Sequence, residues 1–321
     1  MAVPTLLFEE MAFMEILFVP LALLAGVLLT VQVGANTQLS KGAGGPFAAT
    51  TLQLGVGALV LILLAALLGT LGAVGSLPDV TWWHAFGGLA SAFYVCSTIV
   101  LFAKLGAIVS VGLFIAGQML ASLALDGFGL LGVEPAPIGV ASALGALGVV
   151  VGAAVIVGAQ AGEKGVEQAA SNPGWVLLAL VAGAVLPVQG AVNALLRGDI
   201  GAPITVGAIS FVVATAGMAL VLLLVVATGR APKPRVRPLG GVPWWGWLGG
   251  ICGAAYVTTV FTALPAIGVA AVVGLTVTGQ QVASVFFDRY GLMRMPHKPV
   301  PGVRLLGVAL LLVGVILIQA I

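Results

Sequence analysis

The chain contains an approximate copy of itself, and the two copies share polar residues inside apolar segments. Residues 21–46 align without a gap on residues 178–203. Matches of leucine and alanine carry little information in so apolar a chain. The informative matches are polar or proline residues: Gln32 with Gln189, Asn36 with Asn193, and Pro46 with Pro203. Repeated polar positions inside hydrophobic segments indicate a membrane protein built from two halves.

A second correspondence pairs residues 117–130 with residues 279–292. It matches three polar positions, spaced four residues apart: Gln118, Ser122 and Asp126 with Gln280, Ser284 and Asp288. Extended backwards, the same register matches two tryptophan pairs and a tyrosine: Trp82-Trp83 with Trp244-Trp245, and Tyr94 with Tyr256. Each half therefore repeats the same series of segments.

The composition requires a membrane. The chain is 61% hydrophobic and 7% charged, whereas a soluble domain has about 25% charged residues. Apolar stretches of about 20 residues, the length that crosses a bilayer, recur along nearly the whole chain. They lack the alternating polarity of membrane strands, so we expect an all-α integral membrane protein with ten transmembrane helices. The predicted spans are 16–39, 46–69, 82–103, 107–126, 137–159, 175–196, 203–228, 244–264, 267–287 and 301–320.

The repeat divides the chain into two units of five helices. We expect a leader at 1–15, a first five-helix repeat at 16–159, a polar linker at 160–174 and a second repeat at 175–321. The fifth and tenth spans share a seven-residue glycine spacing, Gly145/Gly152 and Gly307/Gly314. Because five is odd, the second copy must enter the membrane from the opposite side, so the repeat is predicted to be inverted.

The basic residues test this inversion. Of the 12 Lys and Arg residues, all but Arg197 fall in the loops that one side of the membrane would hold. Lys/Arg bias marks the cytoplasmic side. Equivalent loops of the two halves have opposite charge, as an inverted repeat requires. The count predicts that both termini are extracytoplasmic.

Four amides are the first candidates for a binding site. Gln32 and Asn36 are four residues apart, so they share one helix face near the middle of the first span. Gln189 and Asn193 repeat this pattern in the sixth span. Such amides can serve as interhelical hydrogen-bond contacts, or they can line a cavity, because inverted-repeat carriers bind substrate near the midplane at the repeat interface. The second reading is favoured, because two amides on each face exceed what one contact needs.

The second polar face supplies further candidates, which fall into two groups. Gln118, Gln280, Tyr94 and Tyr256 are candidates for substrate contact, with helix association as the alternative for the tyrosines. Asp126, Asp288, Ser122 and Ser284 are candidates for gating or coupling. Each aspartate falls at the C-terminal end of its helix, where the dipole is unfavourable, so each is expected to have a donor partner.

No metal site, cofactor or catalytic constellation is expected. No acidic or histidine residue lies in mid-span, and no acyl-transfer, metalloprotease or phosphate-binding motif occurs. Cys96 and Cys252 are expected to be packing residues. His84 and His297 are expected to be solvated interface residues.

Two motifs carry a resemblance to a known family. Two Q-x-x-x-N segments are each followed by G-x-P, and two G-Q-x-x-x-S-x-x-x-D segments each have a glycine three residues later. These motifs resemble the YdcZ-like family, a bacterial inner-membrane group within the drug/metabolite transporter superfamily. The resemblance covers almost the whole chain, twice. It implies a ten-helix fold with a cavity between helices 1–4 and 6–9, and with helices 5 and 10 packed peripherally.

We therefore expect a secondary transporter that exports a small polar or zwitterionic metabolite by alternating access between inverted repeats. One alternative is a proton-coupled multidrug exporter that uses Asp126 and Asp288. Another is a non-transporting membrane scaffold or subunit whose polar faces bind partner helices. The expected partners are the lipid bilayer and a small-molecule substrate, without nucleic acid. A homodimer is one assembly compatible with the sequence.

Overall fold

A computed structural model of the chain describes residues 3–105, 107–135, 139–170, 173–235, 237–294 and 302–319. Within these ranges the regular elements are helices, joined in places by short 3₁₀ turns. The α-helices are α1 (Val3–Ala43), α2 (Pro46–Leu67), α3 (Leu89–Leu105), α4 (Ala107–Phe128), α5 (Val140–Ala170), α6 (Pro173–Ile200), α7 (Pro203–Ala227), α8 (Leu248–Ile267), α9 (Val269–Tyr290) and α10 (Gly302–Gln319). The 3₁₀ turns are η1 (Leu71–Asp79), η2 (Trp82–Phe86), η3 (Leu130–Gly132), η4 (Arg237–Gly241), η5 (Trp244–Trp247) and η6 (Leu292–Arg294).

The helices are of membrane-spanning type. In the described part of the chain, 8 helical segments are long and apolar enough to cross a bilayer. α5 and α10 are apolar over the shorter stretches Val140–Ile156 and Gly302–Ile318. Helices suit a bilayer because they satisfy every backbone group internally. The chain is thus an all-helical integral membrane protein. α5 continues to Ala170, so most of the predicted linker at 160–174 has a helical backbone, and α1 includes most of the predicted leader.

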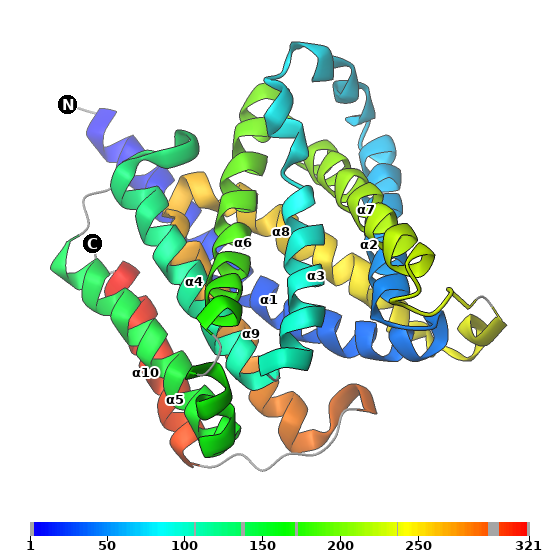
Figure 1. Ribbon diagram of the computed structural model, residues 1–321. Helices are drawn as coiled ribbons and strands as arrows, with labels where there is room; N and C mark the ends of the chain where they lie inside the picture. The colour runs from blue at the N-terminus through cyan, green and yellow to red at the C-terminus, as the bar shows by residue number, and fades with distance from the viewer. Residues whose placement is uncertain are drawn as a thin grey trace.

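The first helix of each half packs on the other half. α1 contacts α8 and α9, and α6 contacts α3 and α4. α2 pairs with α7, and α5 pairs with α10. Figure 1 shows the α5/α10 pair at one flank of the bundle and the α2/α7 pair at the other. The repeat seen in the sequence therefore reappears as a repeat of helix contacts.

Glycines bring these helices into backbone contact at equivalent places. A Cβ added to Gly26 of α1 would collide with the Thr276 carbonyl oxygen of α9, and one added to Gly279 would collide with the Leu23 carbonyl oxygen of α1. The α4/α6 contact repeats this arrangement at the equivalent residues: Gly117 against Leu180, and Gly183 against Phe114. In a bilayer the hydrophobic effect does not drive helices together, because lipid is as apolar as their side chains. Membrane helices instead associate through close packing at small residues.

The glycines of α5 and α10 form a seam of the same kind. Gly145 faces the backbone of Gly314, and Gly152 faces the backbone of Gly307. Neither position has room for a Cβ atom. The shared seven-residue spacing therefore places two pairs of glycines face to face, two turns apart.

The G-x-P motif forms the turn after the first helix of each half. Gly44 and Gly201 both have positive φ, 91° and 71°, a conformation that favours glycine. Pro46 and Pro203 then begin α2 and α7, where a missing N–H costs nothing. The motif is thus a helix stop followed by a helix start.

Candidate functional site

The predicted amides of the first half lie in a cluster formed by α1, α2 and α8. We call it the first polar cluster; its residues are Gln32, Asn36, Thr50, Gln53, Gly249 and Gly253. The side chain of Gln32 lies against Gly253, where an added Cβ would be 3.0 Å from Nε2. The side chain of Gln53 lies against Gly249, with its Cδ 3.2 Å from an added Cβ. Gly249 and Gly253 are one turn apart, so both glutamines face the same side of α8.

Several hydrogen-bond acceptors of this cluster have no donor within reach among the described residues. Asn36 Nδ2 lies 3.4 Å from Thr50 Oγ1. Within the described part of the chain, Gln32 Oε1, Asn36 Oδ1 and Gln53 Oε1 are buried and have no hydrogen-bond partner. Buried polar atoms are bonded in the great majority of cases. Three unpaired oxygens in one cluster therefore mark a place with unused binding capacity.

The amides of the second half lie in the equivalent cluster of α6, α7 and α3. We call it the second polar cluster; its residues are Gln189, Asn193, Ser210, Gly87 and Ser91. Both amide atoms of Gln189 lie near the Ser91 hydroxyl, Oε1 at 3.0 Å and Nε2 at 2.8 Å. Asn193 Nδ2 donates to Ser210 Oγ at 3.1 Å, and Asn193 Oδ1 is buried without a partner in the described residues. Hydroxyl groups thus satisfy most of this cluster.

The tyrosines and the second pair of glutamines flank these clusters. Tyr94 packs edge-on against Phe114 of α4, with ring centroids 5.3 Å apart. Tyr256 is buried and packs with Ala25 of α1 and Val272 of α9. Gln118 is buried in α4, and the main-chain oxygen of Gln280 accepts a hydrogen bond from Thr30 at 3.0 Å. The Thr30–Gln280 bond and the packing of Tyr256 on α1 join helices of the two halves, whereas the Tyr94–Phe114 contact lies within the first half.

Asp126 holds the start of a helix from the other half. Its carboxylate accepts hydrogen bonds from the Val269 and Ala270 backbone N–H groups, at 2.9 and 2.7 Å. These are the first two residues of α9. A carboxylate at a helix N-terminus pairs with unsatisfied N–H groups and with the favourable end of the dipole. The donor expected for Asp126 is therefore this helix end.

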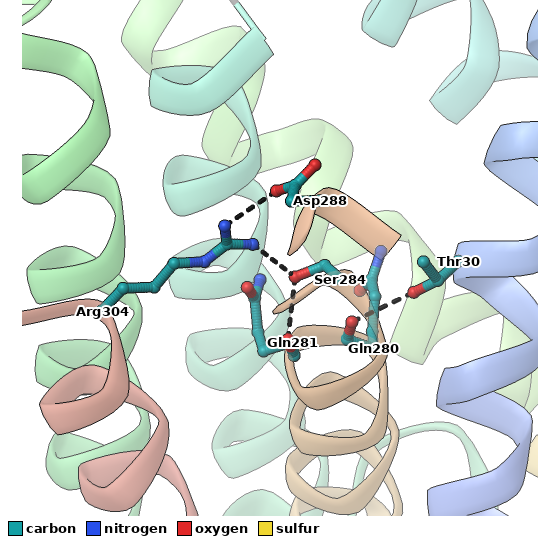
Figure 2. A network of polar contacts seen from close by, with 6 residues as sticks. All are labelled: Thr30, Gln280, Gln281, Ser284, Asp288 and Arg304. Atoms are coloured by element: carbon teal, nitrogen blue, oxygen red, sulfur yellow. Dashed lines mark hydrogen bonds and ion pairs between the residues drawn. The ribbon is translucent and has the colours of Figure 1, made fainter. Parts of the chain in front are cut away.

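Asp288 has a different partner. Arg304, at the start of α10, is 2% exposed, and its Nη1 lies 2.8 Å from Asp288 Oδ2. Arg304 Nη2 also donates to Ser284 Oγ at 3.0 Å, while the Ser284 hydroxyl donates to the Gln281 carbonyl (Figure 2). The sequence predicts Arg304 to be a cation of the loop before the tenth span, whereas the residue is a buried ion-pair partner. Ser122 bonds its own helix at Met119, equivalent to Gln281.

A cavity of about 1010 Å³ opens at one end of the bundle. The ends of α4, α6 and α8, the turn η3 and the junction of α8 with α9 enclose it. Its ionisable lining residues are Asp126, Glu134, Arg197 and Asp199. Arg197 also donates from Nη1 to the Thr262 carbonyl oxygen at 3.1 Å. Of the residues predicted for the site, Asp126 alone lines this cavity.

The expectation that His84 is a solvated interface residue is wrong. The residue is 9% exposed, its Nδ1 lies 2.5 Å from Asp199 Oδ2, and the Trp83 ring contacts it edge-on. Turn η2 places it beside the end of α6, a contact that local sequence does not encode. Trp82 and Trp244, which begin η2 and η5, are exposed as interfacial anchors would be. His297 lies outside the described residues.

These features define a multi-pass helical membrane protein with buried polar clusters between two similar halves. A family model described as "Putative inner membrane exporter, YdcZ" matches residues 17–155 and again residues 174–317. The chain belongs to this YdcZ family of inner-membrane exporters. The family assignment supports a multi-pass protein of the bacterial inner membrane with a role in export.

Several solved structures are similar to this chain, and one of them illustrates the shared fold. A crystal structure titled "Crystal structure of protein" is similar over 94% of this chain and 97% of that chain, with 20% identity and a TM-score of 0.65. At this identity the similarity concerns the fold. A search of curated proteins returned no match.

Proposed function

We propose that the chain exports a small polar or zwitterionic metabolite by alternating access between two inverted five-helix halves. The observation that carries this proposal is that the buried amide oxygens of Gln32, Asn36 and Asn193 have no hydrogen-bond partner among the residues that the structure describes. They lie where the first helix of each half meets the other half, and inverted-repeat carriers bind substrate at such an interface. A substrate that donates hydrogen bonds would satisfy them.

The open cavity at one end of the bundle supports alternating access. Leu131 of η3 and Ala191 of α6 both line the open cavity. Their equivalents in the repeat are Met293 of η6 and Gly34 of α1, and there the methionine side chain lies directly against the glycine. Gln38 Nε2 also donates to the Met293 carbonyl at 3.2 Å. Turn η3 likewise packs on α6, where Gly132 lies against Leu195. We infer that the cavity beside this contact is the opening of a carrier that faces one side.

The aspartates fit a gating role better than a proton-coupling role. Asp126 is bonded to the first turn of α9, and Asp288 is paired with Arg304. Both carboxylates therefore fix helix ends near the rims of the bundle. We propose that they hold the ends of α4 and α9 in register while the halves move.

Replacing Gln32 with leucine is expected to abolish transport while leaving the protein inserted and folded. Leucine is similar in size but offers no acceptor. The measurement is uptake into proteoliposomes of radiolabelled amino acids, polyamines, sugars and quaternary amines, alongside a thermal melting curve. Thr37→Val is the matched control, because Thr37 is exposed on the same helix and bonds its own backbone at Val33.

Two results would contradict this proposal. Normal uptake by both Gln32→Leu and Asn36→Leu would assign these amides to helix association. Absence of uptake and of any thermal shift by wild type, together with tight co-purification of a second protein, would favour a membrane scaffold instead.

A further inference from the structure

The two polar clusters occupy equivalent positions, and each includes the third helix of the opposite half, α3 in the second cluster and α8 in the first. They differ at one residue of that helix. In the second cluster this residue is Ser91, whose hydroxyl lies within 2.8 to 3.0 Å of both amide atoms of Gln189. In the repeat register the equivalent residue of the first cluster is Gly253, which has no hydroxyl to offer. Gln32 lies against Gly253, and its Oε1 has no partner among the described residues. The difference between serine and glycine at this one position thus explains why Gln189 has a side-chain hydrogen-bond partner and the Gln32 oxygen has none among the described residues.

A second difference lies on the neighbouring helix. Ser210 of α7 accepts the hydrogen bond from Asn193 Nδ2 at 3.1 Å. The equivalent residue of α2 is Gln53, a longer side chain that carries its own acceptor. Gln53 is 4% exposed, and its Oε1 has no partner within the described residues. The first cluster therefore gains an acceptor at the place where the second cluster has a bonded serine.

The first cluster thus presents acceptors. The oxygens of Gln32 and Gln53 lie beside Gly253 and Gly249 of α8, which carry no side chains to compete for them, and Asn36 of α1 adds a third acceptor. The described side chains of the cluster are amides and a threonine hydroxyl, without a carboxylate. Amide oxygens are complementary to N–H groups, and a charged donor makes the stronger hydrogen bond.

We propose that the first polar cluster binds the substrate through an N–H-bearing ammonium group, and that Gln53 contacts the substrate together with Gln32 and Asn36. The Gln189–Ser91 pair of the second cluster holds helices α6 and α3 together. This inference rests on the proposed transport function and names its substrate class, an amine with N–H donors. It also makes Gly253 a specificity-determining position, because a hydroxyl there would hydrogen-bond the Gln32 amide in place of the substrate.

The test compares two substitutions at one residue. Gly253→Ser introduces the hydroxyl that Ser91 provides in the other half. Gly253→Ala introduces the same Cβ without the hydroxyl, and the flexible end of Gln32 can shift to accommodate it. The probes are ethanolamine and putrescine, each paired with its fully N-methylated quaternary form, and binding to the purified full chain is titrated by thermal shift.

We expect both amines, but neither quaternary form, to stabilise the wild type and Gly253→Ala. Gly253→Ser and Gln53→Leu should each weaken amine binding about tenfold or more, as loss of a hydrogen bond to a charged group predicts. Thr37→Val, on the exposed face of α1, should bind like wild type.

Three results would overturn the inference. Equal binding of the quaternary forms would exclude recognition through N–H donors. A shift produced by sodium chloride alone would assign the oxygens to a metal cation, which amide oxygens also bind. If Gly253→Ser and Gly253→Ala bind the amines equally well, position 253 does not determine specificity. If Gln32→Leu still abolishes transport of a compound that is not an amine, the proposed function stands and this inference fails.

Discussion

Replacing Gly279 with valine should prevent the chain from folding to a stable, monodisperse protein. A Cβ at this position would fall on the carbonyl oxygen of Leu23 in α1, which is backbone and cannot rotate away. Overpacking in a core costs about 1–3 kcal/mol and occasionally more, and here the α1/α9 contact itself must separate. The measurement is fluorescence-detected size-exclusion chromatography after detergent extraction, followed by a melting curve.

Gly158→Val is the matched control for this substitution. Gly158 is also a helical glycine, but it is exposed, and nothing lies within 4 Å of an added Cβ. We expect this variant to behave like wild type. A Gly279→Val protein with the wild-type elution profile and melting temperature would show that α1 and α9 do not pack as described.

Replacing Arg304 with methionine should lower the free energy of unfolding by about 3–5 kcal/mol, because it leaves the Asp288 carboxylate buried without its cation. Arg304 and Asp288 are 2% and 8% exposed, so solvent replaces little of the lost interaction. The measurement is a denaturant or thermal unfolding curve of the purified protein. Arg230→Gln, at an exposed basic residue, is the control and should have little effect.

A double-mutant cycle separates the ion pair from other effects at these positions. Because the two groups are in contact, Asp288→Asn combined with Arg304→Met should be more stable than the sum of the single losses predicts. Additive losses would mean that the pair contributes nothing specific, and that the buried arginine acts through its other contacts.

Much of the fold could be predicted from the sequence because the information was local or repeated. Hydrophobic length predicted membrane helices, and the structure describes them. The glycines shared by the fifth and tenth spans anticipated a common role, and α5 and α10 pack through those residues. The G-x-P motif ends one helix and begins the next in both halves.

The sequence did not predict the partners of Arg304 and His84, because these side chains make contacts with residues far away in the chain. Arg304 looked like one cation of a basic loop, yet it begins α10 and reaches Asp288. His84 looked like an interfacial residue beside tryptophans, yet it pairs with Asp199 at the end of α6. No spacing rule connects these residues, since only the packing of helices brings them together.

In the candidate site, too, the repeated residues could be predicted from the sequence and their long-range partners could not. The amides of α1 and α6 stood out because they repeat as a pair in apolar segments. Which of them is satisfied depends on the helix from the other half, which carries Ser91 in one case and Gly253 in the other. Gln53 was missed because its equivalent is Ser210, so the position does not repeat as an identity.

The inverted arrangement of the two halves is the central claim, and labelling of equivalent loops tests it most directly. Single cysteines replace Gly75 in η1 and Gly240 in η4, where an added Cβ meets nothing within 4 Å. The background carries Cys96→Ala and Cys252→Ala. A membrane-impermeant maleimide applied to intact cells should label Gly75→Cys and should label Gly240→Cys only after permeabilisation. Labelling of both cysteines from the same side of the membrane would contradict the inverted repeat.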